Sequence, residues 1–237
     1  MSQNEPLLVV SATEKEVEPL LKASHSIERK SVNRLSIKIA NHPVKILITG
    51  VGSPLCTFET STYLARHKVP IAFHIGIAGS FIKKLLKAEV VLIVEDEFGD
   101  LGLENSKGFH TLIEAGFIGA NEFPFSENKL LNKIPAGILL PEGMRKVRGL
   151  TINLVTSNKD RVRERHLKFK AEVETMESAA FFYCCLKTGT PFISIRGISN
   201  EVGEEDRSGW MIEKSIQNSC DTLIDILHKN NFFINEA

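Results

Sequence analysis

Short apolar runs alternate along this chain with segments in which apolar residues recur at helical spacing. Runs of strand length cover residues 7–10, 44–49, 71–75 and 90–94, and helical patterns follow at 14–22 and 55–67. The second half repeats this order, with strands predicted at 150–155 and 192–195 and helices at 159–168, 178–186 and 207–228. Strands this apolar are typical of a sheet covered on both faces. The pattern predicts an α/β fold.

Residues 98–148 interrupt the alternation with glycine, proline, asparagine and isolated phenylalanines. We interpret this stretch as an elaborated loop region and not as a second domain, because no linker, internal repeat or low-complexity tract separates it from the rest. A chain of 237 residues with 43% hydrophobic content can bury one substantial core. The sequence therefore predicts a single domain over residues 1–237.

Charge and cysteine content narrow the class of protein. Lys and Arg number 29, as do Asp and Glu, so the net charge of +0 gives no basis for holding nucleic acid electrostatically. A small-molecule ligand fits this balance better.

The four cysteines lack C-x-x-C spacing and indicate buried free thiols. No stretch approaches about 18 apolar residues, which predicts a cytoplasmic protein without a membrane span or secretion signal.

Metal, dinucleotide and P-loop chemistry find no support in the motifs. The seven histidines include no H-E-x-x-H sequence and no i,i+4 pair, so we expect no metal and no cofactor. Gly50 and Gly52 lack the third glycine of a dinucleotide fingerprint, because Leu55 occupies its place, and there is no Walker sequence.

Ligands of an open α/β sheet bind beyond the carboxyl ends of its strands, so the residues that follow each predicted strand are the candidates for a site. Small and polar residues gather at these places, in segments 11–16, 49–53, 76–80, 156–158, 176–177 and 196–200. This coincidence predicts one pocket that is assembled from several loops.

Two carboxylates in these segments suggest nucleoside chemistry. Glu177 could simply complement the dipole at a helix start, but a carboxylate there can also accept hydrogen bonds from two vicinal ribose hydroxyls. Met176 beside it offers a polarizable contact for a sugar or base. Glu16 could belong to a solvated first helical turn; pointed into the pocket, it could instead take a proton from water that attacks an anomeric carbon.

Five segments together resemble the nucleoside phosphorylase and methylthioadenosine/adenosylhomocysteine nucleosidase superfamily, and within it the futalosine hydrolases of menaquinone biosynthesis. They are residues 10–17, 76–81, 100–104 with Gly108 and Phe109 downstream, 176–183, and 195–200 with Trp210. The resemblance covers most of the chain. It implies a single nucleoside phosphorylase-like domain with three α/β/α layers around a central mixed sheet.

The resemblance also implies roles for residues of this chain. Glu16 would activate water, and Met176 and Glu177 would hold the ribose. Arg196 would support the loop in which Ser199 and Asn200 face the purine. The remaining substrate-binding candidates are Ile77, Ala78, Gly79, Ser80 and Thr156. Relatives pair subunits, so we expect a homo-oligomer in which Phe109 or Phe117 could complete a neighbour's pocket.

Asn200 departs from the aspartate that adenine-specific nucleosidases carry at this place. An amide cannot give up a proton to N7, but it can donate hydrogen bonds to N7 and to a 6-oxo group, which favours hypoxanthine as the base. No arginine stands directly before Gly76 to clamp phosphate, which favours water over phosphate as nucleophile. The sequence thus predicts an N-glycosyl hydrolase of futalosine that releases hypoxanthine. A methylthioadenosine/adenosylhomocysteine-type nucleosidase and a non-catalytic nucleoside sensor are the alternatives.

Overall fold

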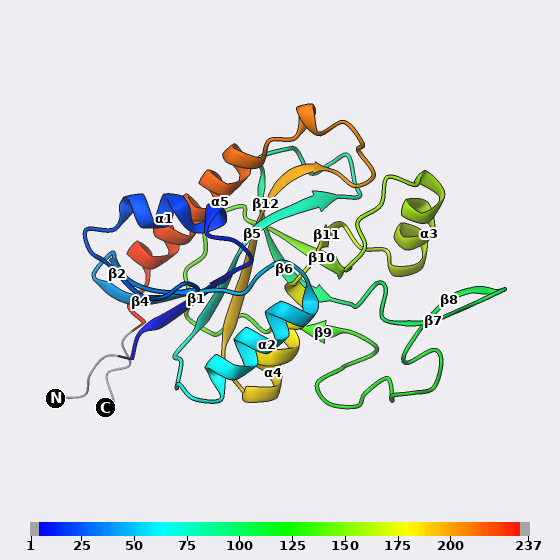
Figure 1. The fold of residues 1–237 in the computed structure, drawn as a ribbon, viewed down its shortest axis with the longest axis horizontal. Helices are drawn as coiled ribbons and strands as arrows, with labels where there is room; N and C mark the ends of the chain where they lie inside the picture. Colours follow the sequence, from blue (N-terminus) through cyan, green and yellow to red (C-terminus); the bar gives the residue numbers. More distant parts are fainter. Residues whose placement is uncertain (1–4, 233–237) are drawn as a thin grey trace.

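A mixed sheet lies between two layers of helices in the computed structural model, which describes residues 5–232 (Figure 1). The strands are β1 (Leu7–Ser11), β2 (Ile27–Ser31), β3 (Arg34–Ile39), β4 (His42–Ile48), β5 (Ala72–Ser80), β6 (Val90–Asp96), β7 (Gly102–Asn105), β8 (Gly108–Thr111), β9 (Leu130–Leu131), β10 (Arg145–Thr151), β11 (Val173–Thr175) and β12 (Phe192–Glu201). The helices are α1 (Glu18–Ala23), α2 (Ser53–Leu64), α3 (Lys159–Phe169), α4 (Ser178–Thr188) and α5 (Ile212–Lys229), with short 3₁₀ turns η1 (Lys15–Val17) and η2 (Arg207–Gly209).

The order of strands in the main sheet is β11-β10-β6-β12-β5-β1-β4-β3-β2, with β9 beside β6. Strand β5 pairs in parallel with both β1 and β12, whereas β12 and β6 are antiparallel, as are β3 and β4. The predicted central mixed sheet is therefore confirmed. The irregular region contributes the two-stranded hairpin β7-β8, which projects from the body of the molecule (Figure 1).

Each face of the sheet carries its own apolar core. Helices α2 and α4 cover one face and share a buried cluster with Val10, Val91 and Ile198. Helices α1 and α5 cover the other face over a second cluster that includes Val9 and Ile195 (Figure 1). Neighbouring residues of one strand point to opposite faces, so a strand buried on both sides is a continuous apolar run. The predicted three-layer arrangement is confirmed.

Several predicted boundaries were wrong. The strand predicted at 150–155 ends at Thr151, because the backbone N–H groups of Asn153 and Leu154 donate to the side chain of Asp100 and do not continue the ladder. Strands β5 and β12 run past their predicted ends at 75 and 195, so segments 76–80 and 196–200 lie inside strands. Strand β2 was missed because all five of its residues are exposed and carry no apolar pattern.

All four cysteines are free and buried, as predicted. Within residues 5–232, no helix has the length and apolar character that crossing a membrane requires.

A buried carboxyl at the end of β6 makes stability depend on pH. Thr151 Oγ1 donates to Asp96 Oδ1 at 2.9 Å, while Oδ2 has no hydrogen-bond partner among the described residues. Burial raises the pKa of Asp96 from 3.8 to about 8. Between these values the folded chain keeps a proton that the unfolded chain releases. The stabilisation is therefore complete below pH 3.8 and is lost as the pH rises toward 8.

We expect Asp96→Asn to flatten the decline in unfolding free energy between pH 5 and pH 9, by on the order of a few kcal/mol. Urea unfolding at both pH values measures the difference. Asp225→Asn is the control, because Asp225 pairs with Lys229 at the surface. Equal declines in the wild type and Asp96→Asn would show that this carboxyl does not titrate with folding.

Candidate active site

Glu16 lies in η1, directly after β1, and its carboxylate is held by four donors. Its Oε2 accepts hydrogen bonds from Ser11 Oγ at 3.1 Å, Thr13 N at 3.0 Å and Thr13 Oγ1 at 3.1 Å. Its Oε1 accepts from Ile77 N at 3.3 Å. The half-buried carboxylate therefore points toward β5, and the solvated helical turn considered as an alternative is excluded.

Gly76 makes room for this carboxylate. A Cβ at position 76 would lie 2.5 Å from Glu16 Oε1, which is closer than atoms can approach without a shift. The residue also has a φ of +154°, which L-residues rarely adopt. Glycine is thus required here for the close approach of β5 to Glu16.

Glu177 precedes α4 and is 8% exposed. Its Oε1 accepts from Gly52 N at 2.8 Å, and its side chain makes no capping hydrogen bond to α4, so it does more than complement the helix. Burial raises the pKa of Glu177, while the Gly52 N–H and the charge of Arg196 lower it. Ser53 Oγ donates to Met176 O at 3.2 Å, which ties the turn before α2 to the segment before α4.

Asp100 and Asn153 support this turn and were not among the predicted site residues. Ser53 N donates to Asn153 Oδ1 at 3.0 Å. Asn153 N in turn donates to Asp100 Oδ2 at 2.6 Å, and Asn153 Nδ2 donates to Asp100 Oδ1 at 3.2 Å. A chain of hydrogen bonds therefore runs from Asp100 to the turn that holds Glu177. The only sequence signals were the polar segment 49–53 after a strand and the segment 100–104 used for the resemblance.

Arg196 lies inside the sheet and is 1% exposed. Its Nη1 donates to His74 O at 2.9 Å, and its Nη2 lies 2.8 Å from each ring nitrogen of His74. Burial lowers the pKa of Arg196, and the negative charges of Glu177 and Glu16 oppose this effect. Its hydrogen bonds go to His74 of β5 and to Ile195 O of its own strand, and within residues 5–232 none joins it to Ser199 or Asn200, the segment it was expected to support. Arg196 thus supplies a buried positive charge to the two carboxylates.

The imidazole beside Arg196 is neutral. Burial and the guanidinium charge hold the pKa of His74 well below its usual value. A neutral ring can accept a hydrogen bond from Arg196, whereas a protonated ring would place two cations in contact. The buried charge of Arg196 is therefore not shared with His74.

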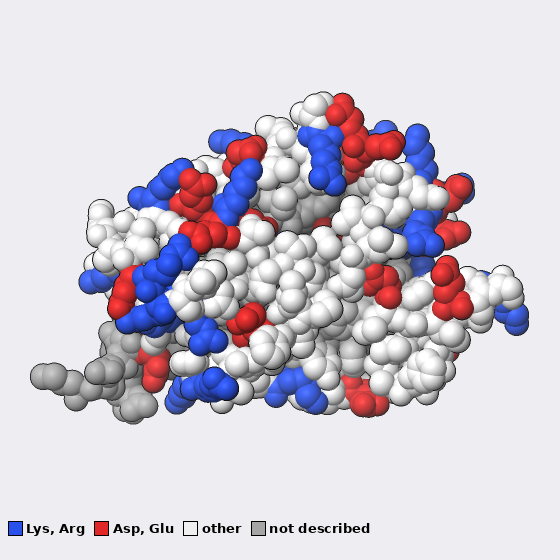
Figure 2. All heavy atoms as spheres, viewed as in Figure 1, with Lys and Arg blue, Asp and Glu red and all other residues white. Residues whose placement is uncertain are grey.

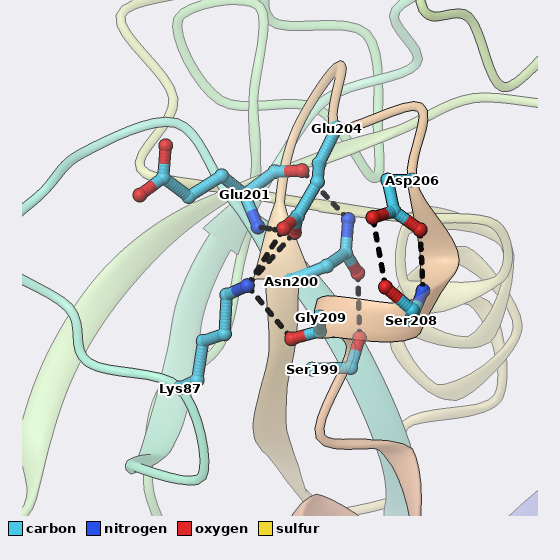
Figure 3. A network of polar contacts seen from close by, with 8 residues as sticks. All are labelled: Lys87, Ser199, Asn200, Glu201, Glu204, Asp206, Ser208 and Gly209. Carbon is cyan, nitrogen blue, oxygen red and sulfur yellow. Dashed lines mark hydrogen bonds and ion pairs between the residues drawn. The ribbon is translucent and has the colours of Figure 1, made fainter.

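Ser199 and Asn200 are buried at the carboxyl end of β12 (Figure 3). Ser199 Oγ lies 2.7 Å from Asn200 Oδ1, and Asn200 Nδ2 donates to Glu201 O at 2.8 Å. A backbone carbonyl only accepts, so Glu201 O fixes which end of the amide carries the nitrogen. One Nδ2 hydrogen then remains without a partner among the described residues. A Cβ added at Gly79 would lie 3.3 Å from Asn200 Nδ2, so the backbone of β5 packs closely against the amide.

Lys87 closes the loop that follows β12 (Figure 3). Its Nζ donates to both carboxylate oxygens of Glu204, at 2.8 and 3.0 Å, and to Gly209 O at 2.8 Å. Met211 N donates to Ser199 O at 2.8 Å. These contacts hold the loop against β12 at Ser199, next to Asn200, the two residues that were predicted to face the base.

Of the remaining predicted residues, some contact the groups described above and others do not. In β5, Ile77 N contacts Glu16, and Ala78 O lies 3.2 Å from Ser199 Oγ. Ser80 Oγ turns to Ile82 O at 2.8 Å, beside a cavity of about 580 Å³ that Glu201 also lines. Thr156 accepts from Asn158 N at 3.1 Å near the start of α3, and this hydrogen bond does not join it to the others.

Residues 6–229 match a family model that is described as the phosphorylase superfamily. Among characterised proteins, the chain is 29% identical to futalosine hydrolase of Thermus thermophilus over 173 residues, which cover 72% of this chain and 75% of that protein. It is 25% identical over 237 residues to 5'-methylthioadenosine/S-adenosylhomocysteine nucleosidase of Bacillus thuringiensis, with 96% of each chain covered.

Solved structures of the same two kinds of enzyme also match this chain. The Colwellia psychrerythraea methylthioadenosine/adenosylhomocysteine nucleosidase in complex with adenine has a TM-score of 0.79 at 18% identity, covering 98% of both chains. Futalosine hydrolase of Helicobacter pylori has a TM-score of 0.78 at 18% identity, covering 96% of this chain and 99% of that one. At such identities these matches establish the fold alone.

Proposed function

Because this chain belongs to the phosphorylase superfamily and is a nucleosidase like its homologues, we propose that its substrate is futalosine. The enzyme would hydrolyse the N-glycosidic bond and release hypoxanthine and dehypoxanthine futalosine. That reaction would place it in menaquinone biosynthesis, and the cytoplasm is the location we expect.

The orientation of the Asn200 amide carries this proposal. Its Oδ1 is engaged by Ser199 Oγ, and its remaining free hydrogen is on Nδ2. Hypoxanthine presents acceptors at both O6 and N7, so an N–H donor suits it. Adenine would bring its amino group to an amide whose oxygen already accepts from Ser199 Oγ and keeps only one lone pair, while the free Nδ2 hydrogen would find no oxygen at the 6-position. The arrangement therefore favours a 6-oxopurine over a 6-aminopurine.

The carboxylates support hydrolysis. Glu16 would take a proton from a water molecule on the face of the sugar opposite the base, and Glu177 would accept hydrogen bonds from the ribose hydroxyls. As the C–N bond lengthens, the sugar gains positive charge, which both carboxylates stabilise, and Asn200 stabilises the negative charge on the leaving base. A phosphate dianion would be repelled by Glu16, while Arg196 is already engaged with His74.

We also propose a homo-oligomer whose contact surface includes α2 and the irregular region. Val51, Leu55 and Phe58 are exposed apolar side chains at the start of α2 and along it, and Figure 2 shows a broad area without charged residues there. Phe117 is 67% exposed, whereas Phe109 packs beside Phe169. Phe117 is thus the better candidate for an aromatic that reaches a neighbouring pocket.

Base release measured by chromatography tests the substrate. Futalosine, inosine, methylthioadenosine and adenosylhomocysteine are each incubated with the enzyme, with and without phosphate. We expect phosphate-independent release of hypoxanthine from futalosine. Release of adenine would show that Asn200 does not select the base as proposed, and dependence on phosphate would identify a phosphorylase instead.

A further inference from the structure

A second cavity, of about 430 Å³, lies between the outer strands β3 and β4 and the C-terminal end of α2. Five cationic side chains and a single carboxylate, that of Glu5, line it; the cations are Lys30, Arg34, Lys45, Arg66 and Lys68. In a chain with 29 basic and 29 acidic residues, this is a strong local excess of positive charge. Figure 2 shows basic side chains gathered on the left of the molecule, near β4 and the end of α2.

Nearby carboxylates neutralise only part of this charge. Lys30 pairs with Glu28, and Arg34 lies 4.0 Å from Glu59. Lys45, Arg66 and Lys68 form no ion pair within residues 5–232. Cations that line one cavity repel one another unless an anion compensates them.

Helix α2 accounts for only part of the cluster. The negative end of its dipole favours cations just beyond Leu64, such as Arg66 and Lys68. Lys45, however, comes from β4, and its Nζ is held 2.8 Å from Ser36 Oγ of β3. The cluster is therefore assembled from the sheet and from the chain beyond the helix, and no single element explains it.

The walls of the cavity suit a small phosphorylated ligand. Its volume is that of a small-molecule site and is too small for a macromolecule. Lysine ammonium groups and the arginine fork are the side chains that bind phosphate oxygens best. The Tyr63 ring stacks on His67 with 4.2 Å between centroids, and the Arg34 guanidinium lies 5.8 Å from the Tyr63 centroid, so a flat aromatic wall borders the charge.

We propose that this cavity binds a chain of two or three phosphates, either as an inorganic polyphosphate or as the phosphate chain of a nucleotide. The site is separate from the nucleoside pocket, because no residue that lines it belongs to the carboxyl ends of β5 and β12. The proposal stands independently of which nucleoside the enzyme hydrolyses.

Titration calorimetry with tripolyphosphate, without divalent metal, tests the site. We expect one binding event per chain that weakens as salt is raised from about 25 to about 200 mM, because ion pairs with phosphate are screened. Exposed Arg66 and Lys68 are then replaced together, as Arg66→Gln with Lys68→Gln. Affinity should fall about tenfold or more, since two charge-assisted contacts are lost. Base release by this variant should be unchanged, which shows that it is folded.

A matched variant carries Lys83→Gln and Arg163→Gln, which remove the same charges from exposed residues beside the other cavity. It should bind tripolyphosphate as the wild type does. Failure of the wild type to bind, equal losses in both variants, or a loss in this variant alone would overturn the proposal. A nucleoside triphosphate that binds more tightly than tripolyphosphate identifies a nucleotide ligand, and equal affinity identifies the phosphate chain alone; both results support the site.

Discussion

Glu16→Gln is expected to lower the rate of base release by about 10³-fold, within the range that general base catalysis contributes, while substrate affinity changes little. The amide has nearly the same shape as the carboxylate but cannot take a proton from water. Ser11 and Thr13 donate to one oxygen of Glu16, and Ile77 donates to the other. The amide nitrogen of glutamine cannot accept either set of hydrogen bonds, so the variant keeps only one of them. Because proton transfer is lost and Glu177 is unaltered, the loss should fall on kcat and leave the proposed ribose binding by Glu177 in place.

Single-turnover release of hypoxanthine from futalosine measures this effect, together with calorimetric binding of the substrate to the variant. Glu14→Gln is the matched control, because Glu14 is an exposed carboxylate two residues away that pairs with Arg29 at 2.6 Å. It should retain full activity. A wild-type rate in Glu16→Gln would remove Glu16 from the mechanism.

Asn200→Asp should shift the ratio of kcat/KM toward adenine nucleosides by about 10- to 100-fold, the size of one gained and one lost hydrogen bond at a buried polar group. Glu201 O now accepts from Asn200 Nδ2 at 2.8 Å and would face a carboxylate oxygen in the variant. Two acceptors in contact favour the protonated acid, which can donate a proton to N7 of the leaving base. The ionised form would instead repel O6 of hypoxanthine.

Rates with futalosine and methylthioadenosine under identical conditions give this ratio. Asn121→Asp introduces the same charge in an exposed loop, where the side-chain oxygen accepts from Glu127 N and the substitution preserves that acceptor. Its ratio should equal that of the wild type. If Asn200→Asp leaves futalosine equally preferred, Asn200 does not read the 6-position of the base.

Strands with buried side chains on both faces could be predicted from the sequence, whereas an exposed strand could not. The apolar runs that became β1, β4 and β6 were recognisable because each strand contributes buried side chains to the apolar clusters on both faces of the sheet. Strand β2 is exposed throughout, so its residues have no reason to be apolar. The carboxyl halves of β5 and β12 contain glycine, serine and asparagine at the candidate site. Because these residue types are typical of loops, the sequence predicted loops there.

The site shows a similar division. Glu16, Glu177 and Asn200 could be chosen as candidates from the sequence because parallel strands end at one edge of a sheet, where polar residues are unusual enough to notice. The link from Asp100 through Asn153 to Ser53 was not, because it joins residues about 50 and 100 positions apart whose contact depends on the path of loops. Thr156 was placed in the site because β10 was expected to continue to 155, and it ends at Thr151.

Alkylation of the buried thiols can report local unfolding of this chain. Thiolate is the reactive form, and burial raises the pKa of Cys184 to about 11 and that of Cys220 to about 12. Alkylation must therefore wait until a helix separates from the sheet. Cys56 and Cys184 belong to α2 and α4 and point into the core on one face of the sheet, whereas Cys220 belongs to α5 and points into the core on the opposite face. The order in which these sulfurs are labelled thus distinguishes which layer of the molecule detaches first.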